Sequence, residues 1–116
     1  MKDTQFHDYV MLDVLSSVNG ITSRSMFGGY GLYKDGTIFG LIADDILYFK
    51  VDEMNKEQYQ HFGSKPFTYE KGNHKQAVMS YWEVPEEIMN DREQVQQWVY
   101  SAVEASKRTK RKLRAT

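Results

Sequence analysis

The chain has no cysteine among its 116 residues. A disulfide framework, a thiolate nucleophile and a cysteine-bound metal are therefore excluded, and the absence fits the reducing cytoplasm. The sequence also has no hydrophobic run near the roughly 18 residues that a membrane-spanning helix needs. Its first residues lack the apolar core of a secretory signal. We therefore expect a cytoplasmic protein that makes no contact with a membrane.

Proline is scarce, with two residues, whereas aromatic residues make up 14% of the chain and hydrophobic residues 41%. Disordered chains are poor in aromatic residues, so this composition predicts a folded body. A chain of this length is of ordinary size for one domain and buries roughly 65% of its unfolded surface. We find no internal repeat and no interdomain linker, so one domain is expected.

The charges are unevenly distributed along the chain. Residues 1–106, which we call the body, carry 9 basic and 16 acidic residues, a balance of −7. Residues 107–116, which we call the basic tail, carry no acid and a balance of +6. The cations of the tail are Lys107, Arg108, Lys110, Arg111, Lys112 and Arg114. An acidic body with a basic tail is an asymmetry that points to a partner or to contacts between the two parts.

Helical spacing of apolar residues predicts a helix at the start of the chain. Thr4 is a suitable N-cap, and Leu12 and Leu15 widen the apolar face of the predicted helix. Asn19-Gly20 is typical of the left-handed turn that follows a helix end. The sequence therefore predicts one continuous helix before residue 19.

A longer helix is predicted at the other end of the body. Asp91 is its expected N-cap, and Gln94 stands three residues later, as in a capping box. The apolar stripe of this helix has five members, Val95, Trp98, Val99, Ala102 and Val103. The stripe fades after Ala105, where the basic tail begins.

The most unusual stretch is Arg24-Ser25-Met26-Phe27-Gly28-Gly29-Tyr30-Gly31-Leu32-Tyr33. We interpret it as a single strand. Three glycines make a strand weak, so aromatic rings or a helix should lie directly against the bare backbone. Asp35-Gly36 then predicts a tight hairpin turn.

Four further strands are predicted by apolar runs and alternation over residues 38–42, 46–51, 67–70 and 77–83. Asp52 is expected to cap a short helix before the fourth strand of the series, with Met54, Tyr59 and Phe62 facing inward. Pro85 begins another short helical turn. The order of elements is helix, three strands, helix, two strands, helix. We therefore predict a two-layer α+β domain, an antiparallel five-stranded sheet with helices on one face.

Four blocks in sequence resemble the TfoX N-terminal domain family (TfoX/Sxy, regulators of competence-specific genes in bacteria). The blocks are Arg24-x-Met26-Phe27-Gly28-Gly29-Tyr30-Gly31 and residues 47–52, 66–69 and 79–85. The resemblance implies a fold similar to secretion chaperones, with residues 1–106 as a single-domain form of the family. It brings no catalytic residue with it. It implies a non-enzymatic regulatory module that acts in transcription by binding another protein.

The family motif supplies candidate residues with a structural or interaction role. They are Arg24, Met26, Phe27, Gly28, Gly29, Gly31, Tyr69, Tyr81 and Trp82. Arg24 is expected to pair with an acid in the sheet, and the alternative is that it marks a binding surface. Tyr69, Tyr81 and Trp82 lie on the last two predicted strands, where side chains alternate between the two faces of the sheet. Some of these rings should therefore face away from the helices. An exposed aromatic sheet face favours a protein partner or a homodimer.

Other chemistry finds little support in the residues. The glycines at 28, 29 and 31 lack the Lys-Ser/Thr of a phosphate-binding loop. His7, His61 and His74 do not form a pair at the spacing of a helical metal motif, and adjacent Asp44 and Asp45 point apart in a strand. We therefore expect no catalytic residue, no metal and no cofactor.

The basic tail leaves two interpretations open. Its six cations, Lys107 to Arg114, could neutralise phosphates and bind nucleic acid without sequence preference. Alternatively, the tail is a solvated end or folds back on the acidic body. No aromatic residue stands among the cations as a stacking platform, which favours the second interpretation.

Overall fold

The computed structural model describes the backbone of residues 4–26, 28–71 and 75–115, and their side chains except those of 69–71, 75–79, 114 and 115. The helices are α1 (Gln5–Tyr9), which continues as the π-helical turn η1 (Val10–Val14), α2 (Lys56–His61), α3 (Glu86–Met89) and α4 (Arg92–Ala115). The strands are β1 (Ile21–Met26), β2 (Gly29–Lys34), β3 (Thr37–Ala43), β4 (Ile46–Lys50), β5 (Pro66–Lys71) and β6 (Lys75–Glu83).

The sheet is antiparallel with the strand order β1-β2-β3-β4-β6-β5. The predicted α+β class is confirmed, but the described sheet has six strands instead of five. The glycine-rich stretch is not one strand, because β1 and β2 pair with each other and place Met26 opposite Gly29. Gly28 lies at the turn with a φ of +78°, a left-handed conformation that glycine adopts without steric cost. The prediction of a single strand through this stretch was therefore wrong.

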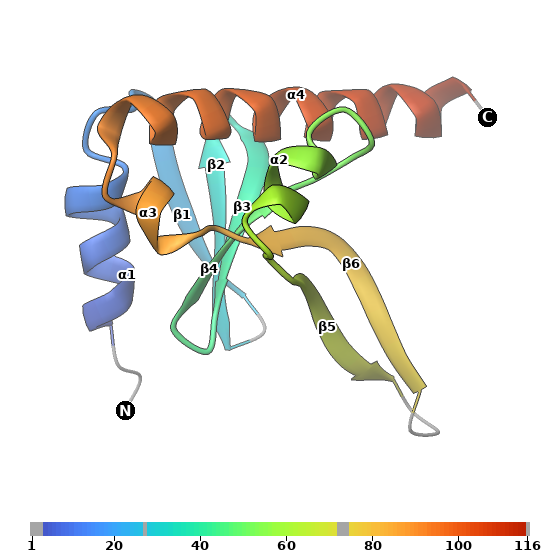
Figure 1. Ribbon diagram of the computed structural model, residues 1–116, viewed down its shortest axis with the longest axis horizontal. Helices are drawn as coiled ribbons and strands as arrows, with labels where there is room; N and C mark the ends of the chain where they lie inside the picture. Colours follow the sequence, from blue (N-terminus) through green and yellow to red (C-terminus); the bar gives the residue numbers. More distant parts are fainter. Residues whose placement is uncertain (1–3, 27, 72–74, 116) are drawn as a thin grey trace.

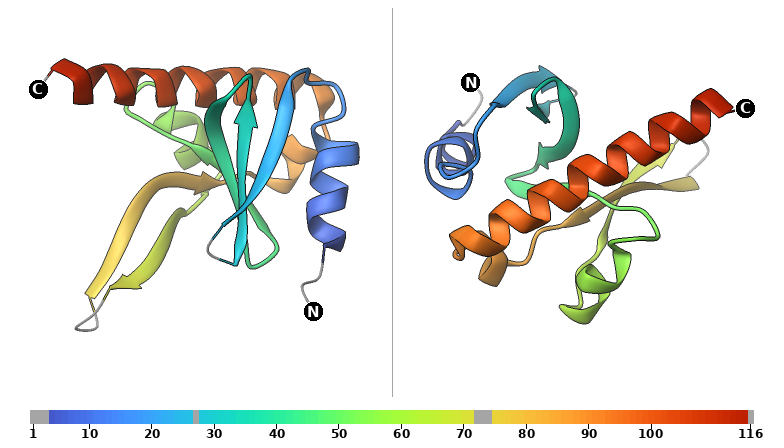
Figure 2. Two further views of the ribbon diagram at one scale, coloured as in Figure 1. Left: turned by 180° about the vertical axis from the view of Figure 1, so that it is seen from behind. Right: turned by 90° about the horizontal axis from the view of Figure 1, so that it is seen from above.

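Strand register divides the side chains between two faces of the sheet. Leu32, Gly40, Phe49 and Trp82 are paired across β2, β3, β4 and β6 and so share a face. This is the face that the helices cover, since its residues pack with apolar residues of α1, η1, α3 and α4. A second cross-strand row marks the opposite face, Arg24, Gly31, Leu41, Tyr48 and Glu83. The predicted two-layer arrangement follows from this register. The right-hand view of Figure 2, taken from above, shows α4 running across the sheet.

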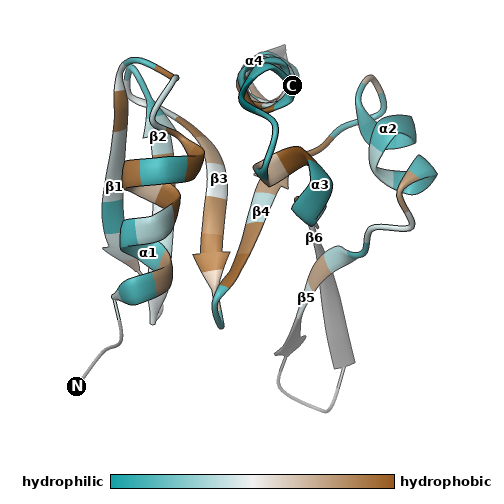
Figure 3. Ribbon diagram, turned by 60° about the vertical axis from the view of Figure 1, so that its left-hand side comes forward, coloured by the Kyte–Doolittle hydropathy of each residue, from teal (hydrophilic) through white to brown (hydrophobic). Residues whose placement is uncertain are grey.

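One hydrophobic cluster joins the two layers. Figure 3 shows that β3 and β4 consist largely of hydrophobic residues, whereas most residues of α2 are hydrophilic. All five residues of the predicted α4 stripe belong to the cluster, together with Phe39 and Phe49 of the sheet. The predicted stripe is therefore confirmed. None of the described helices, α4 included, combines the length and the apolar character that crossing a membrane requires.

The first helix differs from the predicted one. The N–H of Leu15 donates to the carbonyl of Val10 at 2.9 Å, five residues back, which is the bond of a π-helical turn. The wider turn directs Val10, Val14 and Leu15 into the core and leaves Leu12 78% exposed. The prediction that Leu12 lies on the apolar face was therefore wrong. Thr4 contributes its backbone carbonyl, and not its side chain, to the first turn.

The segment after β4 also differs in detail. Asp52 and Asn55 close a turn, in which the Asp52 N–H donates to Asn55 Oδ1 and the Met54 N–H donates to Asp52 Oδ1. α2 therefore begins four residues after Asp52. Tyr59 is fully buried as predicted, but Met54 is 76% exposed and Phe62 is 39% exposed. The predictions that Met54 and Phe62 face inward were therefore wrong. Both residues flank α2, and the helix itself directs Tyr59 toward the core.

α4 begins as predicted and ends later than the apolar stripe. The Gln94 N–H donates to Asp91 Oδ1 at 3.2 Å, which confirms the predicted cap. The helix then continues through the basic tail to Ala115. In Figure 1 it lies along one edge of the molecule, with α3 under its N-terminal end and its C-terminal end projecting beyond α2.

Candidate functional site

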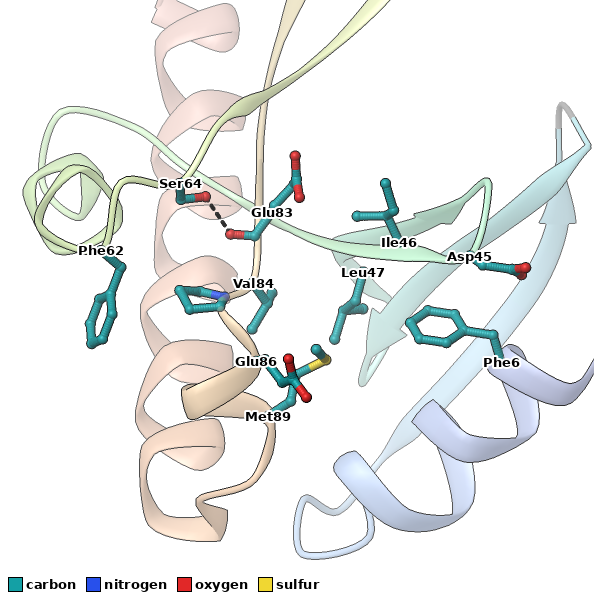
Figure 4. Close-up of a pocket in the computed structure, with 11 residues that line it drawn as sticks. Phe6, Asp45, Ile46, Leu47, Phe62, Ser64, Glu83, Val84, Glu86 and Met89 are labelled. Carbon is teal, nitrogen blue, oxygen red and sulfur yellow. Dashed lines mark hydrogen bonds between the residues drawn. The ribbon is translucent and has the colours of Figure 1, made fainter.

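A groove of about 300 Å³ lies between α1, the turn before β4, the end of β6 and α3 (Figure 4). Its lining residues come from four separate segments of the chain, Phe6, Asp45, Ile46, Leu47, Phe62, Ser64, Glu83, Val84, Pro85, Glu86 and Met89. The groove is where the first helix, the middle of the sheet and the entry to the last helix meet.

The floor of the groove is apolar. Leu47 and Val84 are buried, and the Val84 N–H donates to the Leu47 carbonyl at 2.9 Å, which fixes the chain leaving β6 beside β4. Pro85 then turns the chain into α3, which carries Met89. Figure 4 shows the ring of Phe6 pointing toward Leu47 and Met89 from the other side. The floor is therefore formed by residues that also border the core.

The charged residues of the lining all have one sign. They are Asp45, Glu83 and Glu86, and no lysine or arginine is among the lining residues that the structure describes. In Figure 4 Glu86 lies beside Met89, whereas the carboxylates of Asp45 and Glu83 point outward from the floor. The rim of the groove is therefore acidic and its floor apolar.

The lining of the groove suits binding better than chemical reaction, because its polar groups are carboxylates and one hydroxyl that is already hydrogen-bonded. Ser64 supplies the one hydroxyl among the described lining residues, and it donates to the Glu83 carbonyl at 2.6 Å. Across the described parts of the chain, no three histidine or carboxylate side chains lie close enough together to hold one metal ion. The physical character of the groove is that of a contact site for an apolar group flanked by positive charge.

The glycines of the family motif are positions of close contact. A side chain at Gly29 would collide with the carbonyl oxygen of Ile42. The side chains of Met26 and Tyr33 lie directly over Gly31. The prediction that an aromatic ring or a helix lies against the bare backbone is confirmed at Gly31, where the ring is that of Tyr33, but it was wrong at Gly29, which packs on strand backbone, and at Gly28, which has open space. Phe27, which is also in the motif, lies outside the described residues.

Arg24 is exposed on the opposite face of the sheet. Its Cζ lies 5.7 Å from the ring centroid of Tyr33, a cation–π contact. The ring, and not an acid, is therefore the partner that the structure shows for this guanidinium.

The aromatic residues Tyr81 and Trp82 of β6 pack against other residues and do not form an exposed aromatic face. Trp82 packs against the core, and Tyr81, on the opposite face, is 8% exposed. Burial, followed by the nearby Tyr33, raises the pKa of Tyr81, and Lys50 Nζ lies 5.1 Å above its ring. Burial lowers the pKa of Lys50. The predicted exposed aromatic face was therefore wrong for Tyr81, because the sheet carries covering side chains on both faces; the side chain of Tyr69 is not described.

The cations of the basic tail fall into two groups. Arg108 donates to Asp52 through Nε at 2.6 Å and Nη2 at 2.9 Å, and Lys107 lies 3.7 Å from Glu104. The hydrogen bond from Arg108 is the main reason that the pKa of Asp52 is lowered. The second group is exposed and consists of Lys110, Arg111 and Lys112. Arg108 thus ties the basic tail to Asp52 of the acidic body. The side chain of Arg114 lies outside the described residues.

Sequence reasoning did not find the groove. Met89 and Val84 were visible as apolar residues beside Pro85, and Glu86 as a helix-start acid. Their meeting with Phe6, about 80 residues away in the sequence, depends on how the sheet and helices pack. The local signal available was the acidic first turn after Pro85, which by itself indicates a helix start.

These features define a small α+β domain with an antiparallel sheet, helices against one face and a groove at their junction. The family model of the TfoX N-terminal domain matches residues 13–106, so the chain belongs to this family. A comparison with curated proteins gives no match. The matched residues contain most of the body and end where the basic tail begins, which confirms the resemblance found in the motif residues.

Proposed function

We propose that this chain is a non-enzymatic regulatory module that acts by binding another protein in the groove. Membership of the TfoX N-terminal domain family supports a competence-regulator-like role. The observation that carries the proposal is the groove itself, with an apolar floor between Phe6 and Met89 and an acidic rim. The partner we propose is a component of the transcription machinery.

The groove has the composition of a protein contact site. Its apolar lining includes Phe62, which is 39% exposed at one end of the groove. Apolar surface surrounded by polar groups is typical of protein interfaces. The acids at the rim favour a partner segment that carries lysine or arginine beside its apolar anchor.

A photo-crosslinking experiment tests this proposal. A photoreactive phenylalanine derivative is placed in cells at Phe62, on the groove, or at Tyr100, which is 67% exposed on α4. We expect a protein other than a second copy of this chain to be crosslinked from position 62, absent from position 100, and lost when Met89→Asp is added. Crosslinks that are absent at position 62, or the same from both positions, would contradict the proposal. Circular dichroism checks that the Met89→Asp chain is folded.

Nucleic-acid binding through the basic tail is the second candidate function. The observation that favours it is the exposure of Lys110, Arg111 and Lys112 on the last turns of α4. Phosphate contacts weaken steeply with salt. Titration of a fluorescent oligonucleotide should therefore show binding at low salt that high salt and the triple glutamine variant of these residues abolish. No binding at low salt would rule this candidate out.

A further inference from the structure

The groove and the basic tail are complementary in charge, and each offers an apolar surface. The groove joins an apolar floor to carboxylates, and its described lining includes no cation. In the tail, Lys110, Arg111 and Lys112 precede Leu113, which is the one large apolar residue after position 106. Leu113 is 72% exposed. A helix end with one apolar side chain among cations is the kind of segment that an acidic, apolar groove accommodates.

The two surfaces of one copy cannot meet. α4 begins at Arg92, three residues after Met89 of the groove, and runs as one helix to Ala115. Leu113 is 21 residues beyond Arg92, which at 1.5 Å per residue places it about 30 Å along the helix axis. Arg108 also binds Asp52, which holds the far end of the helix against the loop after β4. Figure 1 shows α3 and the C-terminus at opposite ends of α4.

We propose that the basic tail of one copy docks in the groove of a second copy. Leu113 packs on the floor beside Phe6 and Met89, and the neighbouring cations face the acidic rim, where Glu86 lies beside Met89 and Glu83 points outward. The contact is heterologous, since each copy uses a different surface, and every added copy brings another groove and another tail. The association therefore grows with concentration and weakens with salt.

The same contact gives the groove a means of regulation. A docked tail covers the surface that the proposed function assigns to a partner protein, so the two compete for the groove. This regulatory role depends on the proposed function, whereas the association between copies does not. The groove becomes available as the concentration of the chain falls or as a partner displaces the tail.

Sedimentation velocity of the full chain tests the association. At low salt, the weight-average mass should rise with concentration, and at high salt it should return to that of a monomer. Burying a leucine is worth roughly 1.5–3 kcal/mol, so Leu113→Ser should raise the dissociation constant by about ten- to a hundredfold. Tyr100→Ser removes a similarly exposed large residue of the same helix, 67% exposed against 72% for Leu113, and should leave the association unchanged.

A charge exchange identifies the two surfaces. A chain with Glu83→Lys and Glu86→Lys should be monomeric, and so should a chain with Lys110→Glu, Arg111→Glu and Lys112→Glu. When mixed, the two should associate with each other, because an acidic tail then meets a basic groove. Circular dichroism checks that each variant is folded. If a groove variant does not fold, anisotropy of a labelled peptide of residues 105–116 with the unchanged chain replaces it, with the Leu113→Ser peptide as control.

The outcomes separate this inference from the proposed function. A chain that stays monomeric at low salt at every concentration overturns the inference, even if Phe62 crosslinks to a partner. The inference also fails if the mixed charge variants stay apart, or if the peptide binds no better than its serine control. Association that depends on Leu113 and Glu86, without any partner at Phe62, supports the inference and counts against the proposed function.

Discussion

Gly28 and Gly29 are adjacent, yet they are glycines for different physical reasons. Gly28 has a φ of +78° and open space around the position of a side chain. Gly29 is an ordinary strand residue packed against the backbone of Ile42. The first requires a backbone conformation and the second requires an empty volume.

We expect these two positions to respond differently to substitution. Gly29→Ala should lower the free energy of unfolding by about 2–3 kcal/mol, because the backbone at Ile42 must shift to make room for the methyl group. Gly28→Asn should cost less than about 1 kcal/mol, since asparagine tolerates the left-handed region. Urea unfolding followed by tryptophan fluorescence measures both. Equal losses would contradict the distinction.

Tyr59 is a buried phenol without a hydrogen bond from any residue that the structure describes. Its ring lies between Trp98, at a centroid distance of 4.6 Å, and Trp82, at 6.4 Å. Burial raises the pKa of Tyr59 well above the ordinary value for tyrosine. The ring therefore stabilises the core, while its hydroxyl is desolvated without compensation.

Tyr59→Phe should leave the free energy of unfolding unchanged or raise it by up to about 1 kcal/mol at pH 7. The pH dependence has a definite sign. Above pH ~10 the phenol ionises in the unfolded chain and stays neutral in the folded one, so the unfolded state gains stability. The parent should therefore lose more stability than Tyr59→Phe between about pH 9 and 11, the range in which tyrosine titrates in an unfolded chain. Denaturant titrations across this range measure the difference, and parallel curves would contradict it.

At the scale of elements, α4 is attached to the body in two ways. Its first half packs on the sheet through the stripe that includes Trp98 and Val99. Its second half is held by the paired hydrogen bonds from Arg108 to Asp52. The first attachment is hydrophobic and independent of pH, whereas the second requires an ionised carboxylate.

Asp52→Asn should lower the free energy of unfolding by about 1 kcal/mol at pH 7, a value limited by solvent screening; the side chains of Arg108 and Asp52 are 29% and 22% exposed. Because folding lowers the pKa of Asp52, its contribution is present above about pH 4, the unfolded value, and is lost as the pH falls through the folded value. The difference between parent and variant should therefore shrink in acid. Glu53→Gln, an exposed neighbour, is the matched control.

For the whole molecule, the basic tail carries charge but contributes little to the core. Among the described residues, the hydrophobic cluster includes none after Val103, and Ala105 and Ser106 are the last buried residues that the structure describes. The first half of α4 thus supplies the apolar packing, and its last turns carry the positive charge.

Truncation tests this separation. A chain ending at Thr109 keeps Arg108 and should lose less than about 0.5 kcal/mol of unfolding free energy. A chain ending at Lys107 also loses the bond to Asp52 and should be destabilised by about 1 kcal/mol more. Thermal unfolding at matched concentration compares them. A large loss on ending at Thr109 would show that the final turns of α4 support the fold.

Local patterns were sufficient for much of this protein. The Asp91 cap, the α4 stripe and the Asp35-Gly36 turn depend on residues a few positions apart, and each is present in the structure. The family motif was also readable, because its blocks occur in order along the chain. The α+β class follows from the same short-range periodicities.

Packing over long distances in the sequence decided the rest. Splitting the glycine-rich stretch into β1 and β2 required Gly29 to approach Ile42, and burying Tyr81 required side chains from neighbouring strands. The groove required Phe6 and Met89 to meet. Periodicity states which way a side chain points within its own element, whereas the surface it meets there is determined by how separate elements pack together.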